Sequence, residues 1–274
     1  MNQYRQSGFP HTPPVVKNLL IINVLVFIVQ QLFEHRGIRI GGHSFEDIFA
    51  LHYWRSANFQ WWQLLTHQFM HGGFTHIAFN MFALWMFGRI LEDVWGPQKF
   101  IIFYIICGVG AAICHLAVLT YEFAPFQQVL TQYQQHPNIS DFFRIAHTYP
   151  VRYPEVEAFY NNWQLQPDST GFAGKSIDIL KTHWDEATVG ASGAVFGLLF
   201  GFGYLFPNIE MYIYFIPVPI KAKWVVAGYC FIELTQGVAH SAGDNVAHFA
   251  HLGGALFAFL LLRFWGNKFR NRYY

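Results

Sequence analysis

The chain has 274 residues, of which 53% are hydrophobic and 12% are charged, whereas charged residues make up about 25% of an ordinary soluble domain. Its formal net charge of +1 excludes a large basic surface for nucleic acid. Its three cysteines form no CxxC pair and give no disulfide framework. Together with 30 Phe, 14 Tyr and 9 Trp, this composition predicts an all-α polytopic membrane protein.

Apolar runs predict six membrane-spanning helices between a polar, proline-rich tail (1–14) and a basic tail (266–274). The first three spans and their loops occupy residues 15–120, and the last three occupy residues 188–265. The expected spans are 15–33, 74–94, 100–119, 189–206, 224–238 and 246–265. No small-residue cleavage site follows the first span, so we interpret it as retained rather than as a signal peptide.

Two connecting segments are unusual. Residues 34–66 mix charged side chains with large aromatic ones, which suits either a loop at the membrane interface or an ordinary amphipathic connector. Residues 121–187, between the third and fourth spans, carry eight acidic and four basic side chains. This insertion is too polar to span a membrane and too aromatic to be simply disordered, so we expect either a small folded cap or a tolerated loop.

The distribution of Lys and Arg predicts the orientation of the six spans. Ten of these residues lie on the side that holds both termini, and three lie in the short loops opposite. We therefore expect both termini in the cytoplasm and the insertion at 121–187 on the opposite, extracytoplasmic side of the membrane.

One stretch indicates chemistry: Gly190-Ala191-Ser192-Gly193, at the start of the fourth span. A helix that begins near Ser192 would have spare N–H groups beside the hydroxyl, and these could stabilise an oxyanion. The alternative is packing, because small residues recur every four positions through Gly193, Gly197 and Gly201. His251 in the sixth span precedes a matching small-residue face at Gly254 and Ala258, so packing of the two faces would bring a general base to Ser192.

Other polar side chains in apolar surroundings have competing interpretations. His76 and Asn80 are four residues apart on the second span, and could either donate to an oxyanion or bond to another helix. His248 competes with His251 as the base. His67 and His71 could join His76 at a metal, but no HExxH motif is present.

Glu92 and Glu233 are expected to contact neighbouring helices or loops rather than to act as catalytic acids. Gly243-Asp244 only faintly matches the GxGD motif of aspartyl intramembrane proteases.

Three motifs together resemble the rhomboid intramembrane serine proteases: His76-x-x-x-Asn80, Gly190-Ala191-Ser192-Gly193 and Ala250-His251-x-x-Gly254. The resemblance covers residues 50–120 and 188–265 and includes Gly88-x-x-x-Glu92-x-x-x-Gly96. It implies a six-helix bundle in which Ser192 is the nucleophile and His251 the base, as a dyad without an acidic third member. His76, Asn80 and the Ser192 backbone N–H would form the oxyanion site, and the fifth span would be the mobile gate for substrates.

The same resemblance implies transmembrane protein substrates, a lipid bilayer as surroundings, no metal or cofactor, and a bacterial inner membrane as location. This chain departs from the family pattern at several places. Trp54-Arg55 is a candidate for the tryptophan-arginine pair of the first loop, Ala258 stands where a glycine is usual, and Phe196 stands where tyrosine is frequent. The long insertion is also unexplained by the family.

Two rival functions remain. A catalytically silent rhomboid-like protein would bind or chaperone transmembrane clients, although such proteins normally lack the serine or the histidine. A histidine-rich metal or proton transporter would need paired charges along a path, and only Glu233 is available within a span.

Overall fold

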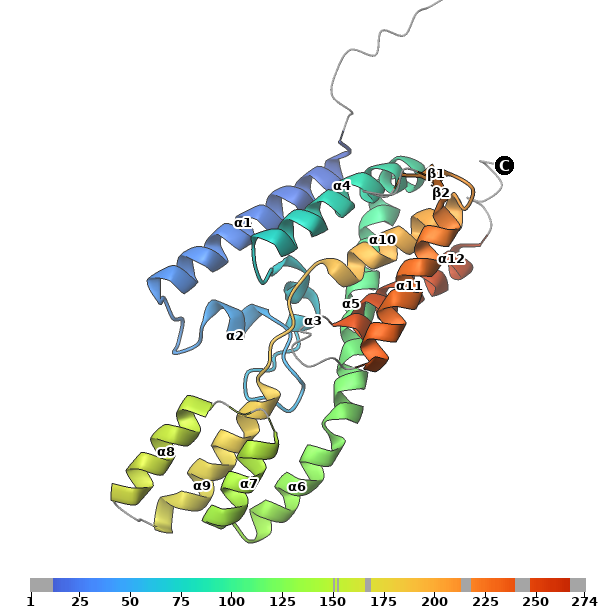
Figure 1. Cartoon of the computed structure of the whole chain (residues 1–274). Helices are drawn as coiled ribbons and strands as arrows, with labels where there is room; N and C mark the ends of the chain where they lie inside the picture. Colours follow the sequence, from blue (N-terminus) through green and yellow to red (C-terminus); the bar gives the residue numbers. More distant parts are fainter. Residues whose placement is uncertain are drawn as a thin grey trace, which may run out of the picture.

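The computed structural model describes residues 12–149, 151, 153–165, 169–212, 218–239 and 247–266, which are mostly helical (Figure 1). Six helices form the main bundle: α1 (Pro14–Arg36), α4 (Phe74–Trp95), α5 (Pro97–Glu122), α10 (Ser192–Leu205), α11 (Ala222–Ala239) and α12 (His248–Trp265). Two short antiparallel strands, β1 (Glu210–Met211) and β2 (Ile220–Lys221), lie between α10 and α11.

Four helices within the described residues are long and apolar enough to cross a membrane: α1, α4, α5 and α12. Large apolar side chains are exposed along their outer faces, for example Leu25 on α1, Phe79 on α4 and Phe264 on α12. Lipid, rather than water, is the solvent that such a surface suits. The chain is therefore a helical membrane protein, and α10 is a shorter apolar helix of 14 residues within it.

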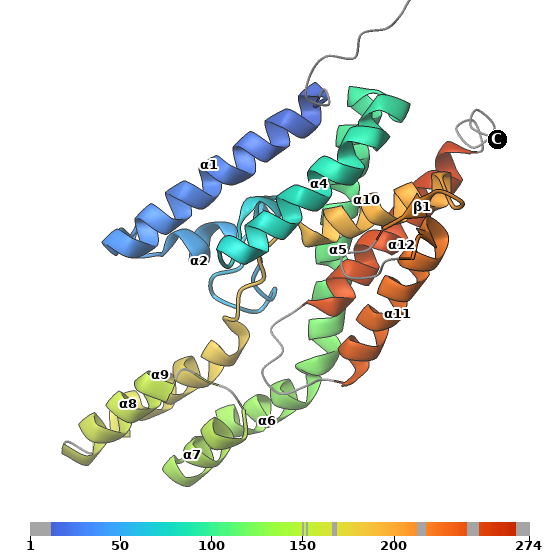
Figure 2. The same ribbon diagram turned by 45° about the horizontal axis from the view of Figure 1, so that its top comes forward.

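The centre of the bundle is α10, which packs against α4, α5, α11 and α12 (Figures 1 and 2). Small residues permit this close packing, as the sequence predicts. A Cβ atom at Gly254 would overlap the Gly193 carbonyl group, and one at Gly197 would lie 3.3 Å from the Gly254 carbonyl oxygen. The faces of α10 and α12 therefore meet backbone to backbone. Gly201 differs, because it faces Phe103 and Trp95 instead of α12.

Several expected boundaries are wrong, for local reasons. The fourth helix begins at Ser192 rather than at residue 189, because Thr188 pairs with Leu51 in a β-bridge and Gly190 has a φ of +133°. The third helix runs from Pro97 to Glu122, so the expected start of the insertion falls inside its last turn. The sixth helix begins at His248, and residue 246 lies outside the described residues.

Glu92 connects α4 to the beginning of α1. Its two carboxylate oxygens accept the backbone N–H groups of Val15 at 3.0 Å and Val16 at 2.8 Å. The first N–H groups of a helix have no partner within the helix, and the helix dipole favours a negative charge there. The expectation that Glu92 contacts a neighbouring helix is confirmed.

The segment between α1 and α4 contains α2 (Phe45–Phe49), α3 (Gln63–Thr66) and a 3₁₀ helix, η1 (His67–Phe69). The Arg55 guanidinium lies 4.4 Å from the centre of the Trp54 ring. Trp54 donates its indole N–H to Thr120 at the end of α5, and Arg55 donates to Gln127. This pair therefore fastens the loop to the start of the insertion.

The described residues of the insertion form four helices and a 3₁₀ turn: α6 (Ala124–Gln135), α7 (Ile139–Thr148), α8 (Tyr153–Leu165), α9 (Ser169–Lys181) and η2 (Thr182–Trp184). It lies beyond the end of α5, on the side of the bundle at which α10 and α12 begin (Figure 1). Phe126, Phe142 and Leu180 are fully buried in its own apolar core, which Tyr53 of the first loop joins. Its aromatic residues thus pack on one another and on the loop, as a folded unit requires.

Candidate active site

The position of Ser192 follows from the extended segment in front of it. The Gly190 N–H donates to the His67 carbonyl at 2.9 Å, and the positive φ of Gly190 turns the chain into α10. Ser192 is the first residue of α10 and is half-buried. Its hydroxyl therefore lies beside backbone N–H groups that the helix itself does not use.

His251 is held beside the first turns of α10. Its ring stacks on Phe196, with centroids 4.5 Å apart, and Phe196 lies one turn after Ser192 on the same helix. Its Nδ1 lies 2.9 Å from Glu233 Oε2, so the neutral ring carries its proton on Nδ1 and keeps a lone pair on Nε2. Among the described residues no hydrogen bond joins Ser192 to His251. Such bonds are often long before a substrate binds.

His76 faces the same place from α4. Its Nδ1 accepts the Gly72 N–H at 3.4 Å, which leaves Nε2 to carry the proton of the neutral ring. A Cβ atom at Gly190 would lie 2.9 Å from His76 Nε2 and 3.5 Å from Ser192 Oγ. Only a glycine allows the imidazole this close to the segment, so a donor N–H lies near the serine hydroxyl.

Asn80 lies one turn after His76 on the same helix, and its side chain is buried. Its Nδ2 group has no hydrogen-bond partner among the described residues. A buried N–H group without a partner costs free energy, so the Asn80 amide is suited to donate to an acceptor that binds there during function.

The expectation that Glu233 contacts a neighbouring helix is confirmed, but its two partners were not foreseen from the sequence. Glu233 of α11 accepts from the Nδ1 atoms of two histidines of α12, His248 at 2.7 Å and His251 at 2.9 Å. The resemblance implies a dyad without an acid beside the base, whereas in this structure Glu233 contacts His251. The three ligand atoms lie within 4.8 Å of one another, so the group could also hold a metal ion. One pattern in the sequence could have indicated this contact: Glu233 is the only acidic residue of α11, and His248 and His251 are three residues apart on α12.

His67 and His71 support the segment around Ser192 without joining the Glu233 group. Gln30 of α1 bonds to both backbone groups of His71, at 3.0 and 3.1 Å, while the His71 ring meets the His76 ring edge-on. Burial lowers the pKa of each of these imidazoles, His67 and His71, to about 4. Both are therefore neutral near pH 7.

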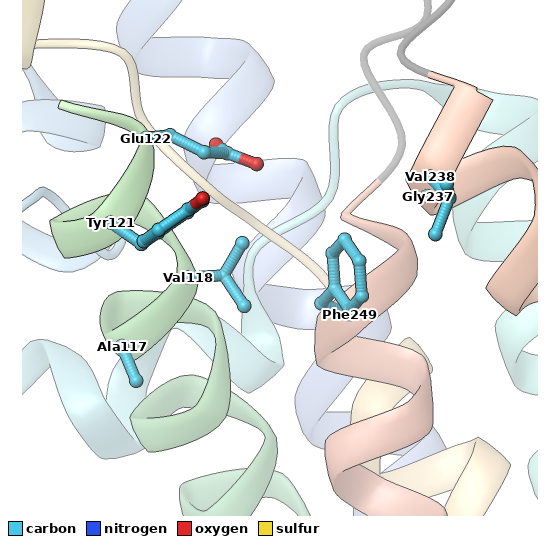
Figure 3. Close-up of a pocket in the computed structure, with 7 residues that line it drawn as sticks. All are labelled: Ala117, Val118, Tyr121, Glu122, Gly237, Val238 and Phe249. Atoms are coloured by element: carbon cyan, nitrogen blue, oxygen red, sulfur yellow. The ribbon is translucent and has the colours of Figure 1, made fainter. Parts of the chain in front are cut away.

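A cavity of about 510 Å³ lies between α5, α11 and α12 (Figure 3). Its lining is mostly apolar and comprises Ala117, Val118, Tyr121, Glu122, Gly237, Val238 and Phe249. None of the four predicted site residues lines it, and few polar groups converge on it. Gly243-Asp244 lies outside the described residues.

Comparison with known proteins identifies the family. The Rhomboid domain model matches residues 58–125 and 167–267, which together make up more than half of the chain and include all four predicted site residues. The chain belongs to the rhomboid family. The recognition made from the three motifs is confirmed, and intramembrane proteolysis is the activity that the family membership supports.

Curated rhomboids match at low identity. The rhomboid protease GluP of Bacillus subtilis is 34% identical over 26% of this chain and 13% of its own length. The rhomboid protease AarA of Providencia stuartii is 29% identical over 35% of this chain and 34% of its own. An uncharacterised mitochondrial rhomboid protein of Schizosaccharomyces pombe is 24% identical over 90% of this chain and 64% of its own.

The chain thus spans less than two thirds of the length of these rhomboid relatives. Those matched along most of the chain are mitochondrial, so the expected location in a bacterial inner membrane is not supported. An integral membrane location is supported by the apolar helices and by the family.

Proposed function

We propose that this rhomboid is an intramembrane serine endopeptidase that hydrolyses peptide bonds in or near transmembrane segments of protein substrates. Ser192 is the nucleophile and His251 the general base. The observation that carries the proposal is the stack of His251 on Phe196, one turn from Ser192, with the lone pair of His251 Nε2 left available. A serine hydroxyl is a weak nucleophile until such a base accepts its proton.

In the proposed reaction the Ser192 Oγ–H proton passes to His251 Nε2 while Oγ bonds to the scissile carbonyl carbon. The carbonyl electrons move to its oxygen, which receives hydrogen bonds from His76 Nε2–H, the Asn80 amide and the Ser192 backbone N–H. His251 then gives the proton to the departing nitrogen, and the C–N bond breaks. Water hydrolyses the acyl-enzyme by the same steps.

The proposed membrane arrangement has six spans. Four of them are the helices that are long and apolar enough to cross a membrane, and α10 and α11 are the other two. Burial of α10 among its neighbours supports this arrangement, since a buried helix need not match the full bilayer thickness. Both termini then lie on the cytoplasmic side, or its mitochondrial equivalent, and the insertion lies on the opposite side. Substrate helices would enter beside α11.

The rival function is a catalytically silent rhomboid that binds or chaperones transmembrane clients. The two functions are separated by mixing the purified protein with a transmembrane test substrate and, separately, with a small fluorophosphonate that reacts with activated serines. We expect Ser192→Ala and His251→Ala to abolish cleavage and labelling, while the exposed controls Ser140→Ala and His43→Ala remain active. Equal cleavage by wild type and Ser192→Ala would refute the proposal.

A further inference from the structure

We propose that Glu233 positions the general base, and this inference rests on the proposed function. Glu233 lies on α11 and is only 8% exposed, whereas Ser192 lies on α10 and His251 on α12. Its Oε2 atom accepts from His251 Nδ1 at 2.9 Å. A carboxylate that accepts from Nδ1 fixes the tautomer in which Nε2 is a proton acceptor, and it also fixes the plane of the ring.

The carboxylate also acts during the proton transfer. When His251 Nε2 takes the Ser192 proton, the imidazole becomes a cation, and the Glu233 charge is already in contact with its other nitrogen. The interaction is strong because both groups are buried. Glu233 gains no proton in this step: the proton remains on His251 until it passes to the leaving nitrogen.

A purely structural role explains the geometry less well. α11 already packs closely on its neighbours through apolar side chains. Val226 lies against Gly203 of α10, where an added Cβ atom would come within 2.5 Å of it, and Phe249 of α12 lies against Gly237, where an added Cβ atom would come within 3.0 Å. Burial of a carboxylate adds little stability to helices that pack in this way. The acid instead lies where its charge can act on the base.

His248 restrains the same carboxylate oxygen. Its Nδ1 lies 2.7 Å from Glu233 Oε2, one helical turn before His251. Two contacts from adjacent turns of α12 hold the carboxylate in place, so that its oxygen is positioned before the reaction begins. His248 thus acts through Glu233 and has no role of its own in the proton transfer.

The placement of Glu233 makes the base depend on the position of α11. This helix packs on α10 and α12, and its Trp224 and Phe231 side chains are exposed. When α11 moves away from α12, Glu233 leaves His251, and the ring loses both its tautomer and its orientation. The base is then oriented only while α11 lies against α12.

The test compares Glu233→Gln, Glu233→Ala and Glu233→Asp with His248→Ala, which removes the second contact to the same oxygen. We expect Glu233→Gln and Glu233→Ala to lower kcat and the rate of fluorophosphonate labelling by roughly 10- to 1000-fold, below the ~10⁴-fold loss in a soluble triad protease. KM should change less than about threefold, because the interaction belongs to the transition state. Glu233→Asp should recover part of the loss. His248→Ala leaves the carboxylate beside His251 but removes one of its two restraints, so we expect it to lower the rate less than Glu233→Ala does.

Two results of these activity measurements would overturn the inference. One is a folded Glu233→Ala protein that is labelled within about threefold of the wild-type rate. The other is a loss in His248→Ala as deep as that in Glu233→Ala, which would indicate a structural cluster instead. Thermal unfolding of every variant in detergent shows which proteins are folded.

A second measurement does not depend on activity. In Ser192→Ala protein labelled with ¹⁵N-histidine, the hydrogen-bonded His251 Nδ1–H should give a downfield proton signal, assigned by its absence from the His251→Ala variant. That signal should disappear when Glu233→Ala is added, and its persistence would overturn the inference. Activity that survives Ser192→Ala refutes the proposed function instead, so the two failures are distinguishable.

Discussion

The ring of Phe196 lies parallel to the imidazole of His251, with centroids 4.5 Å apart and planes 2° from parallel. The stack joins α10, which carries the proposed nucleophile, to α12, which carries the proposed base, one turn from Ser192. A phenyl ring fixes the height of the imidazole above α10, but it cannot fix the rotation of the imidazole within its own plane. Glu233 supplies that second restraint through Nδ1.

Removal of the stack should misplace the base. We expect Phe196→Ala to lower kcat by roughly 10- to 100-fold, because a displacement of about 1 Å can lower a rate by that much. Phe196→Tyr should keep most of the activity, since the ring face is unchanged. The control is Phe200→Ala, one turn further along α10, where the ring contacts Tyr204 and Phe259. Activity per folded molecule should be normal in that control, and equal losses in both variants would contradict the role of the stack.

The Asn80 amide should act only in the transition state. We expect Asn80→Ala to lower kcat by roughly 10- to 1000-fold with little change in KM, as expected for one lost oxyanion donor. The matched control is Asn23→Ala, which removes another buried amide, one that donates to the Leu19 carbonyl within α1. It should lower the unfolding temperature while the kcat of the folded protein stays normal. The opposite pattern in Asn80→Ala, less stable but fully active, would assign Asn80 to helix packing.

The sequence predicted the bundle well because helix existence depends on long apolar runs. Small residues in steps of four also predicted the meeting of Gly193 and Gly254, because that geometry depends on side-chain size alone. Boundaries were less accurate. The β-bridge of Leu51 with Thr188 is a contact between segments far apart in the chain, and no local pattern reveals it.

The residues of the candidate site could be named from the sequence only in part, for a related reason. His76, Asn80, Ser192 and His251 fall in short motifs with fixed spacing, whereas Glu233 and Gln30 are single polar residues in apolar runs. Their partners depend on how two helices rotate against each other, which the spacing within one helix does not determine. The folding of the insertion was foreseeable from its aromatic content, but the entry of Tyr53 into its core was not.

Glu92 should matter for stability and not for catalysis. Glu92→Ala leaves the Val15 and Val16 N–H groups without their acceptors at the positive end of α1. We expect a loss of about 2–4 kcal/mol in the free energy of unfolding, from hydrogen bonds to a charged group. Unfolding in mixed micelles measures it, with the exposed neighbour Asp93→Ala as control. A loss below about 0.5 kcal/mol would contradict the capping role.

Acid should destabilise the fold through the buried histidines of the first loop. The pKa of His67 and of His71 is lowered by burial to about 4, against 6.5 for an unperturbed imidazole. Between these values the unfolded chain binds more protons than the folded one, so stability falls as the pH falls from about 6.5 to 4. A His67→Gln variant should show a smaller loss of unfolding temperature across this range than wild type. An unchanged slope would contradict the role of His67.

The insertion should select substrates without taking part in the chemical step. It touches the rest of the protein through Tyr53, Arg55 and Ser56 of the first loop and through Leu116 and Leu119 of α5, and Ser192 takes part in none of these contacts. Replacing residues 128–181 with a Gly/Ser linker keeps Phe126, Gln127 and Trp184, so Tyr53 stays partly covered. Fluorophosphonate labelling of Ser192 should then stay within about threefold of wild type, because no residue of the proposed reaction is removed. The rate on a helical substrate should change, since the insertion lies on the side where α10 and α12 begin (Figure 1). Unchanged cleavage of every substrate would make the insertion a tolerated loop, and loss of labelling in a folded protein would show that it helps to build the site.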